Sequence, residues 1–111
     1  MSDLLVSKHC VPCRQGTPPL DSSEVAAFLE GLAGWEAVQC HHLTKTFSFA
    51  DFVEALAFVN RLGEVAEAEG HHPDILLAWG KVEVRIWTHV AGGLTENDFI
   101  LAAKADAAAR G

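Results

Sequence analysis

Three helix-start signatures divide the chain and restrict the folds open to it. In each, a short polar side chain is followed three residues later by a carboxylate, and the three pairs are Asp21 with Glu24, Ser48 with Asp51, and Thr95 with Asp98. Such a capping box satisfies backbone N–H groups that a helix leaves unpaired at its first turn. We therefore expect three helices. The first should end near residues 31–34, the second at Gly70 in a left-handed C-cap, and the third should run through the alanine-rich tail.

Short β-prone runs fill the spaces between these helices. Residues 35–40 and 42–47 form one pair, and residues 75–79 and 82–89 form the other. The second pair is joined at Gly80-Lys81, where glycine would supply the positive φ of a tight hairpin. The order helix, strand, strand, helix, strand, strand, helix predicts an α+β fold, with a four-stranded antiparallel sheet and three helices on one of its faces.

The apolar pattern of two elements predicts how the domain packs and associates. In the last strand Val82, Val84 and Ile86 alternate with polar residues, so one face should pack on the helices and the other should carry His89. The second helix has two apolar stripes, Phe52/Leu56/Val59 and Phe58/Leu62/Val65, and one sheet contact needs a single stripe. The surplus stripe and a free edge on the last strand predict a homodimer or homotetramer.

Length and charge limit the partners of the chain. At 111 residues we expect an N-terminal arm at residues 1–16 and a single domain at residues 17–111. The net charge of -7 disfavours nucleic acid and anionic membrane surfaces as partners. The chain has no apolar run of the ~20 residues that cross a bilayer and no secretory signal. These features predict a cytoplasmic protein with a small-molecule ligand or a protein partner.

The three cysteines do not suggest a disulfide framework, because their number is odd and no secretory signal accompanies them. Cys10 and Cys13 form a Cys-x-x-Cys next to His9, but Pro12 marks the region as irregular and the four ligands of a structural zinc site are not present. We interpret the region as a reduced arm, with a metal or redox site as the alternative. Cys40 is expected to fill a strand.

Three histidines form the candidate site. His71 and His72 follow the predicted cap at Gly70, and Pro73 holds His72 extended, so the two rings should diverge. His89 ends the last predicted strand, and the hairpin should bring it towards the pair. Imidazole has an unperturbed pKa of roughly 6.5 and exchanges protons near neutral pH. The histidines predict a small acid/base site, and the alternative for His71-His72 is a solvent-exposed pair in a loop.

Five further residues are candidates for supporting this site. Glu67 lies one helical turn before His71 and could orient its imidazolium, although it could also be a solvated helix carboxylate. Asp98 could serve the helix cap alone, and Trp79 could be a stacking platform or a core or interface residue. Pro73 and Thr88 adjoin the histidines. The second pair, His41-His42, has no clustered carboxylate and is left out of the site.

The spacing of these residues resembles that of pterin-4a-carbinolamine dehydratase. The pattern consists of Glu67, then His71-His72-Pro73, an aromatic at Trp79, His89 and Asp98, with every spacing of the family intact. The likeness extends over about residues 17–108. It implies an enzyme that removes water from 4a-hydroxytetrahydropterin to give quinonoid dihydropterin, with no metal or organic cofactor, working as a dimer or tetramer with its histidines around the pterin.

The residues suit that chemistry. An imidazolium can protonate the departing hydroxide while a neutral imidazole removes a ring-nitrogen proton, and each effect is typically worth ~10²–10⁴ in rate. We expect His71 and His89 to exchange protons and His72 to bind and orient the pterin. Two other functions remain open at this point. One is a zinc or copper site built from Glu67 and the histidines, and the other is a structural adaptor that uses the wide helix stripe.

Overall fold

The structure, a computed structural model, describes residues 5–11 and 16–110. Within them, a mixed order of helices and strands follows the N-terminal segment. The helices are α2 (Ser22–Leu29), α3 (Phe52–Glu69) and α4 (Glu96–Ala109), with a 3₁₀ turn η1 (His89–Ala91) before the last. The strands are β1 (Glu36–Val38), β2 (His42–Ser48), β3 (Asp74–Ala78) and β4 (Lys81–Ile86). The predicted element order is confirmed.

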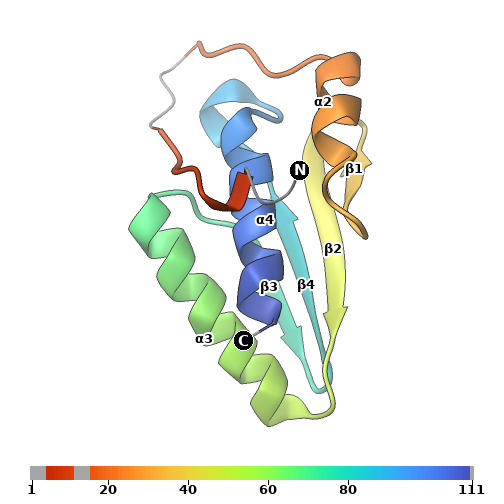
Figure 1. Cartoon of the computed structure of the whole chain (residues 1–111), viewed down its shortest axis with the longest axis vertical. Coiled ribbons are helices and arrows are strands. Elements are labelled where there is room, and N and C mark those ends of the chain that lie inside the picture. Colours follow the sequence, from red (N-terminus) through yellow and green to blue (C-terminus); the bar gives the residue numbers. More distant parts are fainter. Residues whose placement is uncertain (1–4, 12–15, 111) are drawn as a thin grey trace.

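The four strands form one antiparallel sheet in the order β1-β2-β4-β3, and α2, α3 and α4 cover one face of it (Figure 1). The α+β prediction is therefore confirmed. The predicted free edge on the last strand is wrong, because β4 pairs with β2 on one side and β3 on the other. The sheet edges are β1 and β3. Sequence order alone could not reveal that the two hairpins join through their second strands.

Two of the three helix starts lie where the capping boxes place them. Asp21 caps α2 and accepts from the Glu24 N–H, and Thr95 begins α4 with its own N–H bonded to Asp98. The middle box is wrong by one turn. Asp51 is the N-cap of α3 and accepts from the Glu54 N–H at 2.9 Å, whereas Ser48 is the last residue of β2. Both residues are acceptable caps, and pairing of Ser48 with Lys81 keeps it in the sheet.

The hairpin turns differ from the sequence-based expectation in their backbone. The β3–β4 turn is formed by Trp79 and Gly80, and Gly80 does not have a positive φ. The space beside Gly80 is tight, because a Cβ there would lie 3.2 Å from the backbone carbonyl oxygen of Phe49. In the β1–β2 turn, Gln39 and Cys40 have φ values of 53° and 54°, so Cys40 is a turn residue and the prediction that it fills a strand is wrong.

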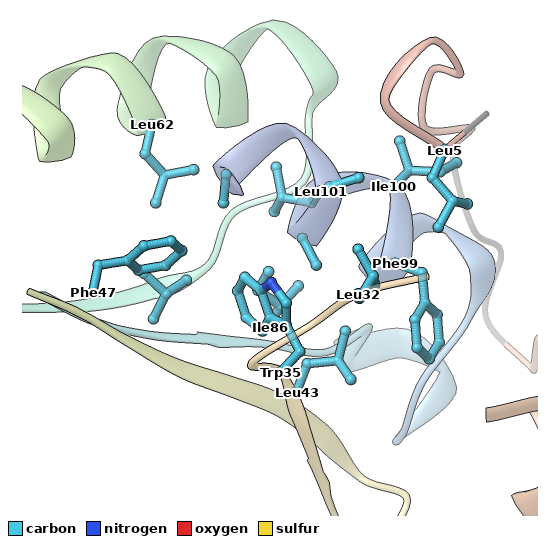
Figure 2. Close-up of a cluster of buried hydrophobic side chains, with 14 of the residues drawn as sticks. Leu5, Leu32, Trp35, Leu43, Phe47, Leu62, Ile86, Phe99, Ile100 and Leu101 are labelled. Carbon is cyan, nitrogen blue, oxygen red and sulfur yellow. The ribbon is translucent and has the colours of Figure 1, made fainter. Parts of the chain in front are cut away.

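The core lies between the sheet and the helices (Figure 2). Val82, Val84 and Ile86 are fully buried along β4, as the alternation predicted. Helix α3 contributes Phe58 and Leu62, both fully buried. Helix α4 packs between α3 and α2 and buries nearly all of its first three turns. This central position of α4 brings its N-terminal residues close to the C-terminal end of α3, where Asp98 contacts His71.

The stripe Phe52/Leu56/Val59 of α3 faces partly outward in the single chain. Phe52 and Leu56 are 42% and 40% exposed and the neighbouring Val53 is 74% exposed, whereas Val59 is partly buried against the core. At the β3 edge, Leu76 and Trp79 are 62% and 69% exposed. The surplus of apolar surface that the sequence indicated is therefore present. No helix among residues 5–11 and 16–110 is long and apolar enough to cross a membrane.

The N-terminal arm packs onto the domain. Leu5 is 7% exposed and belongs to the core cluster, and the Lys104 ammonium donates to the carbonyl of Val6 at 2.8 Å. In Figure 1 the red arm runs beside the C-terminal end of α3 and in front of α4. Cys13 and the rest of residues 12–15 lie outside the described residues, so the Cys-x-x-Cys is described only at Cys10.

Candidate active site

His71 occupies a fixed position immediately after α3. Gly70 ends the helix with a φ of 67°, the left-handed cap that the sequence predicted, and the His71 N–H donates to the Ala66 carbonyl. The His71 side chain is 13% exposed, and its Nε2 lies 2.6 Å from Asp98 Oδ1. Because an ionised carboxylate only accepts hydrogen bonds, Nε2 carries a proton and Nδ1 is left for another partner.

Asp98 is the buried centre of the site. It is fully buried in the first turn of α4, and its Oδ2 accepts from the Thr88 hydroxyl at 2.9 Å and from the Thr95 N–H at 2.8 Å. Together with His71 these donors satisfy both oxygens. One carboxylate thus begins α4, holds the end of β4 through Thr88 and orients His71. Asp98 therefore serves the helix cap, as predicted, and also contacts His71.

Glu67 has a different partner from the one that the sequence suggested. Its Oε1 lies 2.9 Å from His72 Nε2, and the structure places Asp98, not Glu67, on His71. The helix ends between Glu67 and His71, so the one-turn spacing does not continue. The Glu67 and His72 side chains are 82% and 63% exposed. A pair this exposed is worth little in stability, and it leaves His72 free to reorient.

His89 lies just beyond the sheet. The prediction that it ends the last strand is wrong, because β4 ends at Ile86 and His89 begins the 3₁₀ turn η1. Its exposed ring stacks on Trp87, with centroids 4.5 Å apart and planes 12° apart. His41 lies against the same indole at 5.4 Å. The second histidine pair, which we left out of the site, therefore lies near His89, because His41 and His89 both contact Trp87.

The three candidate histidines line one cavity. His71, His72 and His89 share a space of about 430 Å³ with Thr88 and Asn97. This volume lies within the ~300–1,000 Å³ typical of small-molecule sites. The rings come from two segments, the end of α3 and the turn after β4, which are brought together by Asp98 through His71 and Thr88. The gathering of helix-end and strand-end imidazoles that the sequence predicted is present.

Two supporting candidates do not line this cavity. Pro73 precedes β3 and constrains His72 without facing the space. Trp79 lies in the turn at the far end of the β3–β4 hairpin, five strand residues from Pro73, which corresponds to roughly 17 Å at about 3.4 Å per residue. Within one chain Trp79 therefore cannot serve as a stacking platform for a ligand beside the histidines.

Several lining residues were missed at the sequence level. Cys10 and Val11 of the arm form part of the wall, as do Glu69 at the end of α3 and Asn97 next to Asp98. Glu69 and Asn97 carry ordinary helix-surface residue types, so composition and spacing offered no signal for them. The arm was interpreted as irregular, and its part in the cavity wall is seen only from its packing on the domain. The one hint in the sequence was the apolar Val11 within the Cys-x-x-Cys.

The chemistry of Cys10 disfavours a redox role. Its thiol is half-buried and lies 3.6 Å from the Asn97 carbonyl oxygen. Burial, and then the neighbouring Glu69 carboxylate, raise the pKa of the Cys10 thiol to about 12. A reactive cysteine needs the thiolate form, which is negligible here near neutral pH. Among the described residues, moreover, no three His, Cys, Asp or Glu side chains are placed to hold one metal ion.

Comparison with known proteins agrees with this geometry. Residues 18–108 match the family model for pterin 4 alpha carbinolamine dehydratase. A protein of Rubrobacter xylanophilus, provisionally named a pterin-4-alpha-carbinolamine dehydratase, is 52% identical over 92% of this chain and 95% of its own length. A protein of Alkaliphilus metalliredigens with the same provisional name is 48% identical over 92% and 93%.

Two solved structures also resemble this chain. A transcriptional coactivator/pterin dehydratase from Brucella melitensis superposes with a TM-score of 0.78 at 36% identity, over 81% of this chain and 97% of that one. A pterin dehydratase-like protein identified as a RuBisCO assembly factor in the alpha-carboxysome gives 0.54 at 28% identity, over 61% and 79%. The chain therefore belongs to the pterin-4a-carbinolamine dehydratase family, and it is a hydro-lyase.

Proposed function

We propose that this protein removes water from 4a-hydroxytetrahydropterin to give quinonoid dihydropterin, by acid/base catalysis from its histidines. Membership of the family supports the reaction class. The observation that supports the mechanism is the single cavity lined by His71, His72 and His89. Its volume of about 430 Å³ suits a bicyclic heterocycle. The recycled product would return to the pterin-dependent reaction that formed the carbinolamine.

The proposed step breaks the bond between C4a and its hydroxyl oxygen. An imidazolium donates a proton to that oxygen, which leaves as water with the bonding electrons. The lone pair of the adjacent ring nitrogen forms the new C=N bond, and a neutral imidazole accepts the proton that this nitrogen loses. Atoms and charge balance with no oxidant or metal. General acid and base assistance of this kind is typically worth ~10²–10⁴ each.

The surroundings of the rings suggest a division of work. His71 is held by the buried Asp98, so its Nδ1 has a defined direction from which to exchange a proton. His89 is exposed on the other segment and stacks on Trp87, which orients its ring plane. His72 pairs with the exposed Glu67, its one side-chain partner among residues 5–11 and 16–110. We therefore assign proton exchange to His71 and His89, and binding and orientation of the pterin to His72.

This assignment predicts different kinetics for two substitutions in adjacent parts of the cavity. His89→Ala should lower kcat about 10²-fold or more, because it removes a proton-exchanging group. His72→Ala should raise KM several-fold and leave kcat within about threefold, because it removes a contact made equally in ground and transition states. Steady-state kinetics of both variants would check this. A His89→Ala enzyme with unchanged kcat would remove that residue from the mechanism.

The reaction itself is tested by following 4a-hydroxytetrahydropterin in the ultraviolet with and without the protein. We expect decay of the carbinolamine absorbance to accelerate in proportion to protein concentration and to continue over many turnovers. A protein that binds pterin without acceleration would be an adaptor and would contradict the proposal. Purified protein should be active without added metal, and loss of activity on treatment with a chelator would contradict the metal-free step.

We also propose that the chain functions as a homodimer or homotetramer. Two separate surfaces support association. One is the β3 edge of the sheet, and the other is the exposed apolar surface of α3 formed by Phe52, Val53 and Leu56. Sedimentation equilibrium should therefore give a mass of two or four chains, and Leu56→Lys on α3 should lower it. Leu56 is 40% exposed, so a charge there is tolerated in a single chain. A wild-type mass of one chain would contradict this proposal.

A further inference from the structure

The arm forms part of the wall of the candidate active site. Cys10 and Val11 line the cavity that holds the three histidines, although both lie outside residues 18–108, which carry the family match. Val11 is 67% exposed, so its side chain stands at the open side of the cavity. Whatever occupies the cavity therefore meets a wall supplied by a segment distant in sequence from the histidines.

One attachment of the arm is Glu69, two residues before His71. Its carboxylate accepts from the Cys10 N–H at 2.7 Å and pairs with His9 Nδ1 at 2.8 Å, and its side chain is 7% exposed. Burial opposes ionisation of Glu69, but the Cys10 N–H, His9 and Lys104 outweigh it and lower the pKa of the carboxyl. Ionised Glu69 thus holds the arm at neutral pH, and this stabilisation is lost on acidification through the lowered pKa.

The second attachment is Asn97, next to Asp98 in the first turn of α4. Its Oδ1 accepts from the Val11 N–H at 3.0 Å, and its Nδ2 donates to the Val11 carbonyl at 2.6 Å. The backbone N–H and C=O groups of Val11 are therefore both hydrogen-bonded to the Asn97 side chain. Glu69 lies two residues before His71 and Asn97 adjoins Asp98, so the arm is positioned by the same two helix ends that position His71 and Asp98.

We propose that Cys10 and Val11 contact the bound pterin and set its affinity, so that the docked arm determines which ring substituents the site accepts. This inference rests on the proposed function, because it takes a pterin as the ligand. A neutral thiol and an isopropyl group offer apolar contact, which suits the face or edge of a heterocycle and its carbon substituent. Neither Cys10 nor Val11 exchanges protons near neutral pH, and His9 of the arm does not line the cavity. The arm is therefore a positioning element and should act on KM.

The test uses full-length chains with tryptophan placed on the arm. Val11→Trp puts a large side chain at the open side of the cavity, and we expect KM for 4a-hydroxytetrahydropterin to rise about tenfold with kcat within threefold. Lys8→Trp is the matched control, because Lys8 is exposed and lies outside the cavity, and its ammonium forms a surface pair with Glu96. We expect its KM to stay within twofold.

A second variant tests the attachment through a readout independent of catalysis. Glu69→Ala removes the acceptor of the Cys10 N–H, so the arm should loosen around Cys10 while Asn97 still holds Val11. We expect KM to rise and alkylation of Cys10 by iodoacetamide to accelerate at least tenfold. Circular dichroism would verify that the domain remains folded. The alkylation is measured with Cys13 and Cys40 replaced by serine, so that Cys10 is the only thiol.

The outcomes separate the arm from the reaction. An active wild type whose KM is unchanged by both Val11→Trp and Glu69→Ala would overturn the role of the arm and leave the dehydratase proposal standing. A wild type that neither turns over the carbinolamine nor binds a stable dihydropterin would overturn both. The proposed role of the arm would be supported by a tenfold rise in KM in Val11→Trp, an unchanged KM in Lys8→Trp, and a raised KM with faster Cys10 alkylation in Glu69→Ala.

Discussion

Replacing His71 by alanine should lower kcat for carbinolamine dehydration by about 10²–10⁴-fold, with the folded structure retained. The reason is that His71 lines the cavity and its Nε2 is fixed by Asp98 at 2.6 Å, which leaves Nδ1 for proton exchange. His9 also pairs with a nearly buried carboxylate, Glu69, but the His9 side chain is 80% exposed and does not line the cavity. The measurement is kcat by ultraviolet assay, with thermal melting to verify the fold.

Added imidazole provides the decisive control for His71→Ala. If the ring exchanges protons, free imidazole at millimolar concentration should restore part of the lost rate, and the restored rate should depend on pH through the protonation of imidazole itself. His41→Ala serves as the comparison, because His41 lies in the β1–β2 turn outside the cavity and should keep near wild-type rates. A fully active His71→Ala would contradict the assignment.

Asp98→Asn should lower both activity and stability. The three groups around the carboxylate are all donors, and an amide offers them one acceptor oxygen and two N–H groups that face other donors. Breaking a buried charged network of this kind costs ~3–5 kcal/mol, and a change of 1 kcal/mol shifts the melting temperature of a domain this size by about 4–8 °C. We therefore expect a fall in Tm of more than ~10 °C and a 10²-fold or larger loss of kcat.

Glu67→Gln is the matched control for Asp98→Asn. Both changes turn a carboxylate beside a histidine into an amide, but Glu67 is 82% exposed whereas Asp98 is fully buried. The loss of kcat in Glu67→Gln should be at least tenfold smaller, and its Tm should change by only a few degrees. Equal effects of the two changes would show that the His71–Asp98 contact has no special part in catalysis.

Local signals predicted much of this fold because they agree with one another. The capping residues Asp21 and Thr95, the left-handed Gly70 and the alternation along residues 81–86 each specify a backbone conformation with few alternatives. The start of α3 was misplaced because Ser48 and Asp51 are both good caps, and the sheet pairing of Ser48 decides between them. The strand order also required tertiary information, since either strand of each hairpin can occupy an edge.

The sequence predicted those site residues whose spacing along the chain brings them together. It did not predict the residues that reach the site only when the arm packs onto the domain. His71, His72 and His89 line one cavity as expected from their pattern, and Asp98 contacts His71. Glu67 binds the neighbouring histidine because the helix ends sooner than the one-turn rule assumes. The length of β3 places Trp79 at the far end of the hairpin, and the arm joins the wall through its hydrogen bonds to Glu69 and Asn97.

The central claim is that one cavity presents His71 and His89 to the same pterin. Its most direct test is a crystal structure of the protein with a stable dihydropterin bound. We predict the bicyclic ring in the cavity of about 430 Å³, with ring nitrogens of His71 and His89 both within hydrogen-bonding distance of it or of one bridging water. A pterin bound elsewhere on the chain, or one contacting neither imidazole, would contradict the account.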